Sequence, residues 1–219
     1  MSVQEDRLGP AYKIVTPRLV IRCWSPQDAP LLKTAIDESR EHLLPWMPWV
    51  TEESEPLSAK VKLMRLFRAK FDLDEDYAYG IFNKEETVVL GGTGLHLRAG
   101  EDIREIGYWV HRDHVRKGYA TEAVAALTRV AFEIDKARRA EIIIADGNIP
   151  SLGVPKKLGF FQEGIRREFL QMRDGEYVNA HIWTMLPKEY RNLPIHENPV
   201  EAYDVMGNEI PLPQPTFGA

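Results

Sequence analysis

The stretch VRKGYATEA, residues 115–123, places two basic residues and a glycine immediately before a helical pattern. Helices usually begin with an acidic or hydroxyl residue, because their first amide groups are unpaired and the helix dipole is positive at that end. Arg116 and Lys117 are therefore unfavourable there unless an anion binds beside them. The stretch predicts an anion site at the start of a helix.

Gly118 is the centre of this predicted site. A glycine lets the backbone turn tightly and lets a ligand approach the amides with no β-carbon in the way. Successive free amides at a helix N-terminus bind phosphate oxygens, and the small residues Ala120 and Thr121 keep that approach open. We predict that residues 116–121, including Tyr119, bind a phosphate or a diphosphate. The alternative is a plain turn whose basic pair is solvated.

Two familiar phosphate-binding motifs are excluded here. The nucleotide P-loop ends in Gly-Lys-Ser/Thr, whereas in this chain Lys117 precedes Gly118, and the upstream Gly107 is far too early. The dinucleotide fingerprint requires three glycines within a βαβ unit, and this stretch has one. The predicted loop is therefore of another kind.

The composition is that of an ordinary globular protein. Of the 219 residues, 44% are hydrophobic and 28% charged, and the formal net charge of −5 argues against a nucleic-acid partner. No stretch approaches the roughly 20 apolar residues of a membrane span, and the N-terminus lacks a signal-peptide core. We therefore expect a cytoplasmic protein with no membrane partner. The single cysteine, Cys23, excludes an internal disulfide and a cysteine-based metal site, and we expect no metal.

The predicted elements follow a mixed order. Residues 12–24 read as one strand with Pro17 at an edge or bulge, and Ser25 begins a helix that runs to about Glu38. Further strands are predicted at 77–83, 87–98, 105–111 and 140–146, with a bulge at Gly91 and Gly92, a loop at 42–50, helices at 57–71, 121–134 and 150–158, and a closing hairpin that turns at Asp174 and Gly175. This order implies an α+β fold with a largely antiparallel sheet and one parallel crossover.

Prolines recur after Pro187, so we divide the chain into a domain at 1–190 and a proline-rich tail at 191–219. The tail either docks on the surface with one short hairpin, or it covers the site or meets a second subunit. The sequence is compatible with a homodimer.

The joint pattern resembles the GNAT acyltransferase superfamily over about residues 12–187. Gly118 and Ala120 match its diphosphate loop, although Val115 stands where the family has Gln or Arg, and Arg116 offers a replacement contact. The string GYATEA, with GYWV before it and NIPSLGVPKKLGF after it, is similar to the ribosomal-protein alanine N-acetyltransferase branch. That branch carries Asn-x-x-Ser and Lys-Leu-Gly-Phe elements and an early Leu-x-x-Trp-x-x-Trp element; the matching residues are Asn148, Ser151, Lys157, Leu158, Gly159 and Phe160, and Leu43, Trp46 and Trp49.

The resemblance implies the fold and the donor. The strands that end at Val110 and Ala145 are expected to lie parallel and splay apart, with the arm of acetyl-CoA pairing to the backbone at Trp109 and Val110. Residues 116–121 would bind its diphosphate, Asn148 and Ser151 would lie near the thioester, and Lys156 or Lys157 could meet the 3′-phosphate. Acetyl-CoA would be the acyl donor and an amine the acceptor, at a protein N-terminus or on a small molecule.

The implied reaction is direct acyl transfer without a covalent enzyme intermediate. Ser151 is the candidate proton donor to sulfur; otherwise it merely caps its helix. Glu105 is the first candidate base and Glu168 the second, with Gln171 as the alternative occupant of the latter's place. His96 and His181 titrate in a suitable range but read as structural; water could also relay the proton.

Two further interpretations remain open. Trp46 and Trp49 either wall the acceptor pocket or fill the core. The competing function is a protein that binds acyl-CoA for sensing or scaffolding without catalysis, favoured by Val115 and by Gly153 and Pro155, which weaken their helix.

Overall fold

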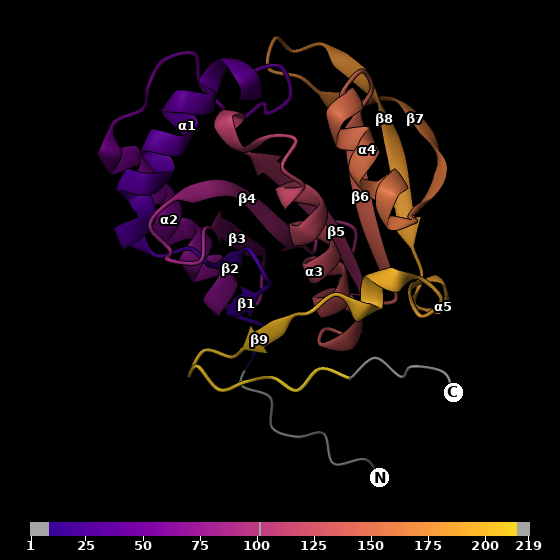
Figure 1. The fold of residues 1–219 in the computed structure, drawn as a ribbon. Coiled ribbons are helices and arrows are strands. Elements are labelled where there is room, and N and C mark those ends of the chain that lie inside the picture. Colours follow the sequence, from indigo (N-terminus) through magenta and orange to yellow (C-terminus); the bar gives the residue numbers. More distant parts are fainter. Residues whose placement is uncertain (1–8, 101, 214–219) are drawn as a thin grey trace.

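The computed structural model describes residues 9–100 and 102–213; residues 1–8 of the predicted domain and 214–219 of the predicted tail lie outside the described part. A mixed sheet is flanked by helices, as Figure 1 shows. Its strands are β1 (Lys13–Val15), β2 (Val20–Cys23), β3 (Tyr77–Phe82), β4 (Val89–His96), β5 (Ile103–Val110), β6 (Arg139–Ala145), β7 (Phe161–Gln171), β8 (Tyr177–Met185) and β9 (Glu201–Tyr203). The α-helices are α1 (Ala29–Leu43), α2 (Leu57–Asp72), α3 (Tyr119–Glu133), α4 (Ile149–Leu158) and α5 (Pro187–Tyr190).

The sheet confirms the predicted fold class. Within the described residues the strands run in the order β7-β8-β6-β5-β4-β3-β2-β1-β9. Neighbouring strands are antiparallel except for β5 and β6, which are parallel and are connected through α3. The predicted helix at 57–71 and the hairpin at Asp174 and Gly175 are also confirmed, as α2 and as the β7–β8 turn.

The prediction of a single strand over 12–24 is wrong. The chain reverses after β1, and β2 returns antiparallel to it, with Ile14 opposite Ile21. Pro17 cannot donate to a strand ladder, and the amide of Thr16 bonds the carbonyl of Leu19 at 3.0 Å to close the turn. The proline therefore marks a tight reversal, which exposes Arg18 at its tip.

A bulge lies directly before the glycine pair at which one was predicted, not at the glycines themselves. Ile81 of β3 pairs with Gly91, but the next residue, Phe82, pairs with Val89, so Leu90 is the extra residue of β4. The bulge shifts the alternation of side chains between the two faces of the sheet.

The parallel pair splays apart, as predicted. β5 and β6 are paired only from Ile103 with Arg139 to Glu105 with Glu141. Both strands continue beyond this point, to Val110 and Ala145, without pairing to each other. The sheet therefore opens in a V between two of its central strands, which leaves backbone groups of β5 without a strand partner.

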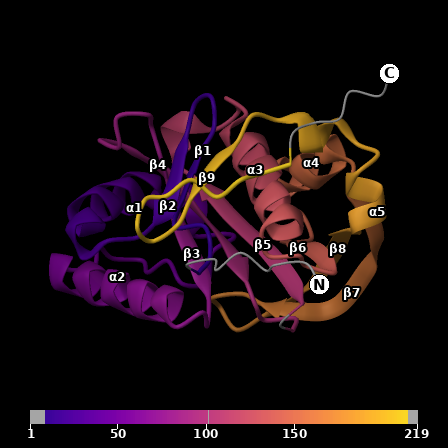
Figure 2. The same cartoon turned by 90° about the horizontal axis from the view of Figure 1, so that it is seen from below.

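Two apolar layers cover the sheet, and Figure 2 shows α3 and α4 on one side of it and α2 on the other. The larger core joins α3 and α4 to β4, β5 and β6 through residues such as Leu127, Val154 and Ile106. The smaller core packs α1 and α2 over β2–β4, with Trp24 and Met64 at its centre. The helices α3 and α4 thus pack against the splayed strands β5 and β6, whereas α1 and α2 pack against β2–β4.

The segment after α5 completes one edge of the sheet. β9 pairs antiparallel with β1, placing Ala202 opposite Ile14, and Tyr203 bridges Glu209 in the short hairpin expected there. Ile195, Ala202 and Ile210 are buried in the larger core. None of the helices in the described part is sufficiently long and apolar to span a membrane.

Candidate functional site

The loop that leads into α3 has the backbone of an anion cradle. Gly118 has φ of 82° and Arg116 has φ of 58°, both in the left-handed region, where glycine is favoured. Among the described residues of α3, Glu122 is the first whose amide donates a backbone hydrogen bond, to the carbonyl of Gly118 at 3.0 Å. The amides of Tyr119, Ala120 and Thr121 are thus left for a ligand.

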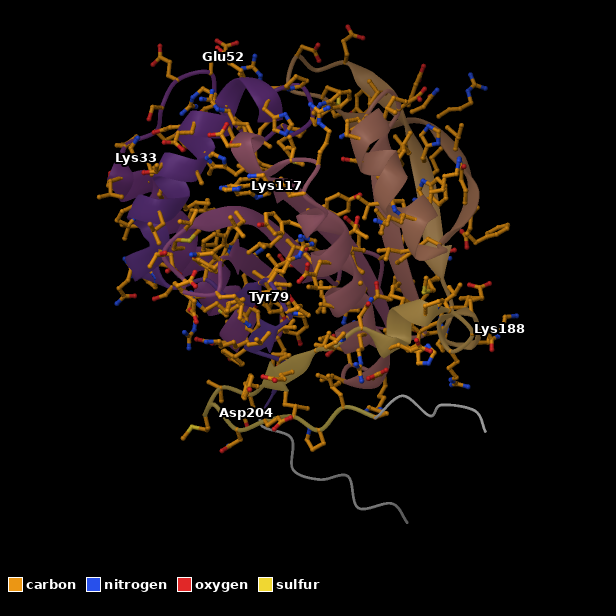
Figure 3. All side chains as sticks on the ribbon, in the orientation of Figure 1. Lys33, Glu52, Tyr79, Lys117, Lys188 and Asp204 are labelled. Carbon is orange, nitrogen blue, oxygen red and sulfur yellow. The ribbon has the colours of Figure 1, made fainter. Side chains whose placement is uncertain are left out.

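Cationic side chains surround this loop. Arg116 and Lys117 are exposed beside it, and Figure 3 labels Lys117 where the loop approaches α3. Burial, followed by the charges of Lys117 and His111, lowers the pKa of His114. The loop is therefore a region of positive potential with free amide donors, a combination that suits a diphosphate.

Arg18 also contacts this loop, and it was not identified as a site residue from the sequence. Its Nη1 donates to the carbonyl of Lys117 at 2.8 Å, and its Nε pairs with Oε2 of Glu122 at 2.6 Å. Its guanidinium lies 4.8 Å from the ring centre of Tyr119. The only sequence signal was an arginine directly after Pro17, and nothing local linked it to a loop about 100 residues away.

A cavity of about 1300 Å³ lies on the α1 and α2 side of the sheet and reaches the V between β5 and β6. It is lined by parts of α1, α2, β4, β5, β6, α4 and β7. Gly92, Gly94 and Gly107 share one face of β4 and β5, since Gly92 pairs with Trp109 and Gly94 with Gly107. The absence of side chains at Gly92 and Gly94 leaves room for the rings of Trp109 and His96, which lie over them.

The two predicted tryptophans both line the cavity. Trp49 packs edge-on against Trp109, with ring centres 6.2 Å apart, so it meets the end of β5. Trp46 reaches the other arm of the V, because a β-carbon added at Gly147 would lie 3.8 Å from its ring. Trp46 is half-buried and Trp49 is 45% exposed, so neither simply fills the core.

The tip of the long hairpin meets the tryptophan loop. Arg173 Nη2 lies 2.5 Å from Oε1 of Glu52, an ion pair between exposed side chains. This contact links the β7–β8 turn to the segment after Trp49.

Asn148 and Ser151 are brought together at the start of α4, and both line the cavity. Asn148 is the N-cap of this helix, and its Oδ1 accepts from the amide of Ser151 at 3.3 Å. Tyr108 donates from Oη to the carbonyl of Ser151 at 2.8 Å, so it bridges the V from β5 to α4. Burial raises the pKa of Tyr108, which keeps it a donor.

Glu105 lines the cavity at the base of the V. Its Oε1 pairs with Nη1 of Arg98 at 2.8 Å, and its carboxylate side chain is 13% exposed. Its parallel-strand neighbour, Glu141, also lines the cavity and pairs with Arg139. Two carboxylates, each with an arginine, therefore lie where the strands separate.

The structure separates the other predicted residues from this cavity. Glu168 lies in a bulge of β7 with φ of 46° and is exposed; its neighbour Gln171 lines the cavity, whereas Glu168 does not. Lys156 and Lys157 are exposed in the last turn of α4, at the opposite end from Ser151. Their predicted roles stay predictions.

His96 and Asp76 form a pair that sequence reasoning did not connect. Nδ1 of His96 lies 2.7 Å from Oδ1 of Asp76, and both side chains line the cavity. Burial opposes the ionisation of Asp76, but the hydrogen bond with His96 outweighs burial and lowers the pKa of this carboxyl group. Among the residues that the structure describes, no cluster of three or more His, Cys, Asp or Glu side chains could hold a metal ion.

The chain is similar in sequence to known proteins. Residues 18–161 match the family described as Acetyltransferase (GNAT) domain. YdaF of Bacillus subtilis, provisionally named a ribosomal N-acetyltransferase, is 30% identical over 76% of this chain and 87% of its own. The enzyme of Escherichia coli named for N-acetylation of alanine on ribosomal protein uS5 is 26% identical over 81% of this chain and 91% of its own.

A solved structure shows the same fold. The microcin C7 self-immunity acetyltransferase MccE, crystallised with acetyl-CoA and AMP, superimposes with a TM-score of 0.71. The superposition covers 78% of this chain and 93% of MccE at 18% identity.

Proposed function

This chain belongs to the acetyltransferase (GNAT) domain family, and from that membership we propose that it acetylates the α-amino group at the N-terminus of a ribosomal protein. It is an N-acetyltransferase and uses acetyl-CoA as its donor, as the family does. A ribosomal acceptor is supported by the names of the two relatives. A small-molecule amine is the second candidate. Both acceptors would place the reaction in the cytoplasm.

The donor fits two features of this chain. The free amides at 119–121 with Arg116 and Lys117 suit the diphosphate of acetyl-CoA, and Arg18 adds a third cation. The unpaired edge of β5, at Trp109 and Val110, suits the amide groups of its arm. Bound there, acetyl-CoA supplies an acetyl group as a thioester. Asn148 and Ser151 would lie on the other arm of the V.

The acceptor would enter from the α1 and α2 side. The cavity there is walled by Trp46 and Trp49 and reaches Glu105 at the base of the V. A cavity of about 1300 Å³ is ample for the first residues of a peptide. The proposal depends on one observation: the cavity that Glu105 lines reaches the edge of β5 that is proposed to bind the donor.

The chemistry requires proton transfers that these residues can perform. The attacking amine must be neutral, so a nearby carboxylate such as Glu105 would accept its proton. Ser151 would donate to the leaving sulfur, and Glu168 is the second candidate base. No nucleophile on the protein is needed, because the amine attacks the carbonyl directly.

Thiol release tests this proposal. The protein is mixed with acetyl-CoA and, in separate reactions, peptides with ribosomal-protein N-termini, the same peptides with blocked α-amines, and small amines. We expect thiol release and a mass gain of one acetyl group only with free α-amine peptides. Release only with small amines would replace the peptide acceptor, and acetyl-CoA binding without release from any amine would favour the sensor hypothesis.

A further inference from the structure

We propose that His96 is a catalytic base for the acceptor amine and that Asp76 is its positioning residue. This inference rests on the proposed function, because it assigns a role within the same cavity. It arises from the geometry of the pair rather than from the carboxylates that the sequence singled out.

The hydrogen bond between the two residues determines which nitrogen is free. An ionised carboxylate only accepts hydrogen bonds, so the 2.7 Å contact with Asp76 requires a proton on Nδ1 of His96. The lone pair of the neutral ring then lies on Nε2. No hydrogen bond from the described residues reaches Nε2, and His96 lines the cavity. A histidine held in one tautomer by a carboxylate is suited to accept a proton at its other nitrogen.

The glycines of the sheet show where Nε2 lies. A β-carbon added at Gly94 would be 2.5 Å from Nε2, and one added at Gly107 would be 3.4 Å from it. The imidazole therefore lies over these two glycines, and a side chain at Gly94 would displace it. Gly107 is two residues beyond Glu105, the last residue of β5 that pairs with β6. Nε2 thus lies beside the part of β5 where the edge facing β6 becomes unpaired, the edge proposed to hold the donor.

His96 and Glu105 are direct neighbours with different surroundings. They face each other across β4 and β5 in the antiparallel register, so their side chains share one face of the sheet. Glu105 is engaged by Arg98, whereas Nε2 of His96 has no hydrogen-bond partner among the described residues, and His96 lines the cavity. Because Arg98 already engages the Glu105 carboxylate, we assign to Glu105 the binding of the ammonium group and to His96 the removal of its proton.

The charged groups at and around the pair come from four parts of the chain. Asp76 precedes β3, Glu105 belongs to β5, and Arg98 follows β4. Arg98 and Lys70, the latter from α2, both act on Asp76 electrostatically and favour its ionised form. An ionised Asp76 is what the assigned tautomer of His96 requires.

The proton balance of the reaction accommodates this base. A protonated amine gives one proton to Nε2, and its neutral nitrogen bonds to the thioester carbonyl carbon. The carbon–sulfur bond then breaks, the nitrogen loses a second proton, and the sulfur gains one. The products are an amide, a thiol and an imidazolium, which returns its proton to solvent.

His181 offers a matched control. It too contacts an aspartate, with Nε2 3.1 Å from Oδ1 of Asp146, but its Nδ1 is engaged by Gln162 at 2.9 Å. Both of its ring nitrogens therefore have protein partners, and it does not line the cavity. His181→Gln should leave turnover and its pH profile unchanged.

The kinetic test compares His96→Gln and Asp76→Asn with the wild type, on one peptide acceptor. We expect His96→Gln to lower kcat about 100-fold and to remove one limb of the pH dependence of kcat/KM. Asp76→Asn should lower kcat less and shift the same limb. Acetyl-CoA affinity by calorimetry should be unchanged in both variants. Wild-type kinetics in His96→Gln, or loss of acetyl-CoA affinity with kcat kept, would overturn the proposal.

Nuclear magnetic resonance provides a readout that does not depend on activity. Long-range nitrogen–proton spectra at pH 8 should show His96 with its proton on Nδ1 in the wild type, and a mixture of tautomers in Asp76→Asn. A proton on Nε2 in the wild type would overturn the inference, whatever the kinetics. A wild type with the expected tautomer but no amine-dependent thiol release would instead overturn the proposed function and, with it, a role of His96 in that reaction.

Discussion

Arg18 and Glu122 form an ion pair of 2.6 Å between Nε and Oε2 that joins the β1–β2 turn to the first turn of α3. Oε1 of the same glutamate accepts from the hydroxyl of Thr16 at 2.6 Å and from the amide of Arg18 at 3.0 Å. Glu122 therefore holds the reversal at Pro17 against the start of α3. Arg18 is thereby held over the loop that contains Gly118.

Arg18→Ala should weaken acetyl-CoA binding about tenfold, because a charge-assisted contact to phosphate would be lost. Calorimetric titration with acetyl-CoA measures this change. Arg68→Ala is the control, since Arg68 is also exposed and pairs with Asp72 at 2.8 Å, away from the loop. Equal affinities in all three proteins would show that Arg18 does not contact the donor.

Gly118→Trp should abolish acetyl-CoA binding, because an indole would cover the free amides of the loop. Gly118→Ala should destabilise the fold by about 1 kcal/mol, the cost of a left-handed conformation for a residue with a β-carbon. Gly207 has φ of 80° against 82° for Gly118, and nothing lies within 4 Å of its added β-carbon. The same substitutions at Gly207 should match the conformational strain and leave donor binding intact. Binding by Gly118→Trp at wild-type affinity would refute the cradle.

Glu105→Gln should lower turnover by roughly 10- to 100-fold and alter the pH dependence of kcat, because a carboxylate beside the acceptor would be neutralised. Donor affinity should be kept. Thiol release measured from pH 6 to about pH 9 covers the relevant ionisations. Glu41→Gln, at an exposed position of α1, is the matched control. A rate and profile identical to those of the wild type would remove Glu105 from the reaction.

The stability contribution of Glu86 should depend on acidity. Burial opposes its ionisation, but hydrogen bonds from Lys13 and Arg22 outweigh burial and lower the pKa of this carboxyl group. Its contribution is therefore complete above the unfolded value of about 4.3 and is lost as pH falls through the lower folded value.

Glu86→Gln should accordingly cost about 1 kcal/mol of unfolding free energy at neutral pH, and the deficit should shrink at about pH 3 and below. Urea unfolding at both acidities measures it, with Glu85→Gln from the same turn as the control. A deficit that stays constant with pH would contradict the assigned ion pairs.

Cys23 should not react with thiol reagents in the native protein. Burial raises the pKa of its thiol to about 12, and its exposed fraction is 7%, so the reactive thiolate is scarce. Ellman's reagent at pH 8 should detect no protein thiol until guanidinium unfolds the chain, and then one equivalent. Rapid labelling of the folded protein would show that β2 opens readily. Because Cys23 is not expected to react in the folded protein, it should add little background to the thiol-release assay.

The local parts of the fold were predictable from sequence. Helix α2 follows from apolar spacing, and the β7–β8 turn follows from Asp174 and Gly175, because each signal lies within a few residues. The reversal at Pro17 was misread as a bulge, since a proline signals either. The pairing of β9 with β1 was not predicted, because no local pattern records which distant strand covers an edge.

The residues of the candidate site also divide into those that local sequence predicts and those that it does not. The left-handed turn at Gly118 was predictable, because a glycine before a helix encodes that backbone conformation directly. Arg18 and Asp76 were missed because their roles depend on partners elsewhere in the chain, Glu122 and His96, that only the fold brings near. His96 was read as structural for the same reason: without Asp76, a strand histidine gives no sign of its tautomer.

The position of β9 determines how late in synthesis this edge of the sheet can be completed. In the part of the chain that the structure describes, residues 201–203 cover the outer edge of β1, so a chain emerging from the ribosome exposes that edge until those residues have been made. Exposed strand edges invite pairing with other chains. A transcript truncated shortly before this point should therefore yield a protein with its donor loop and cavity residues present, yet prone to aggregate.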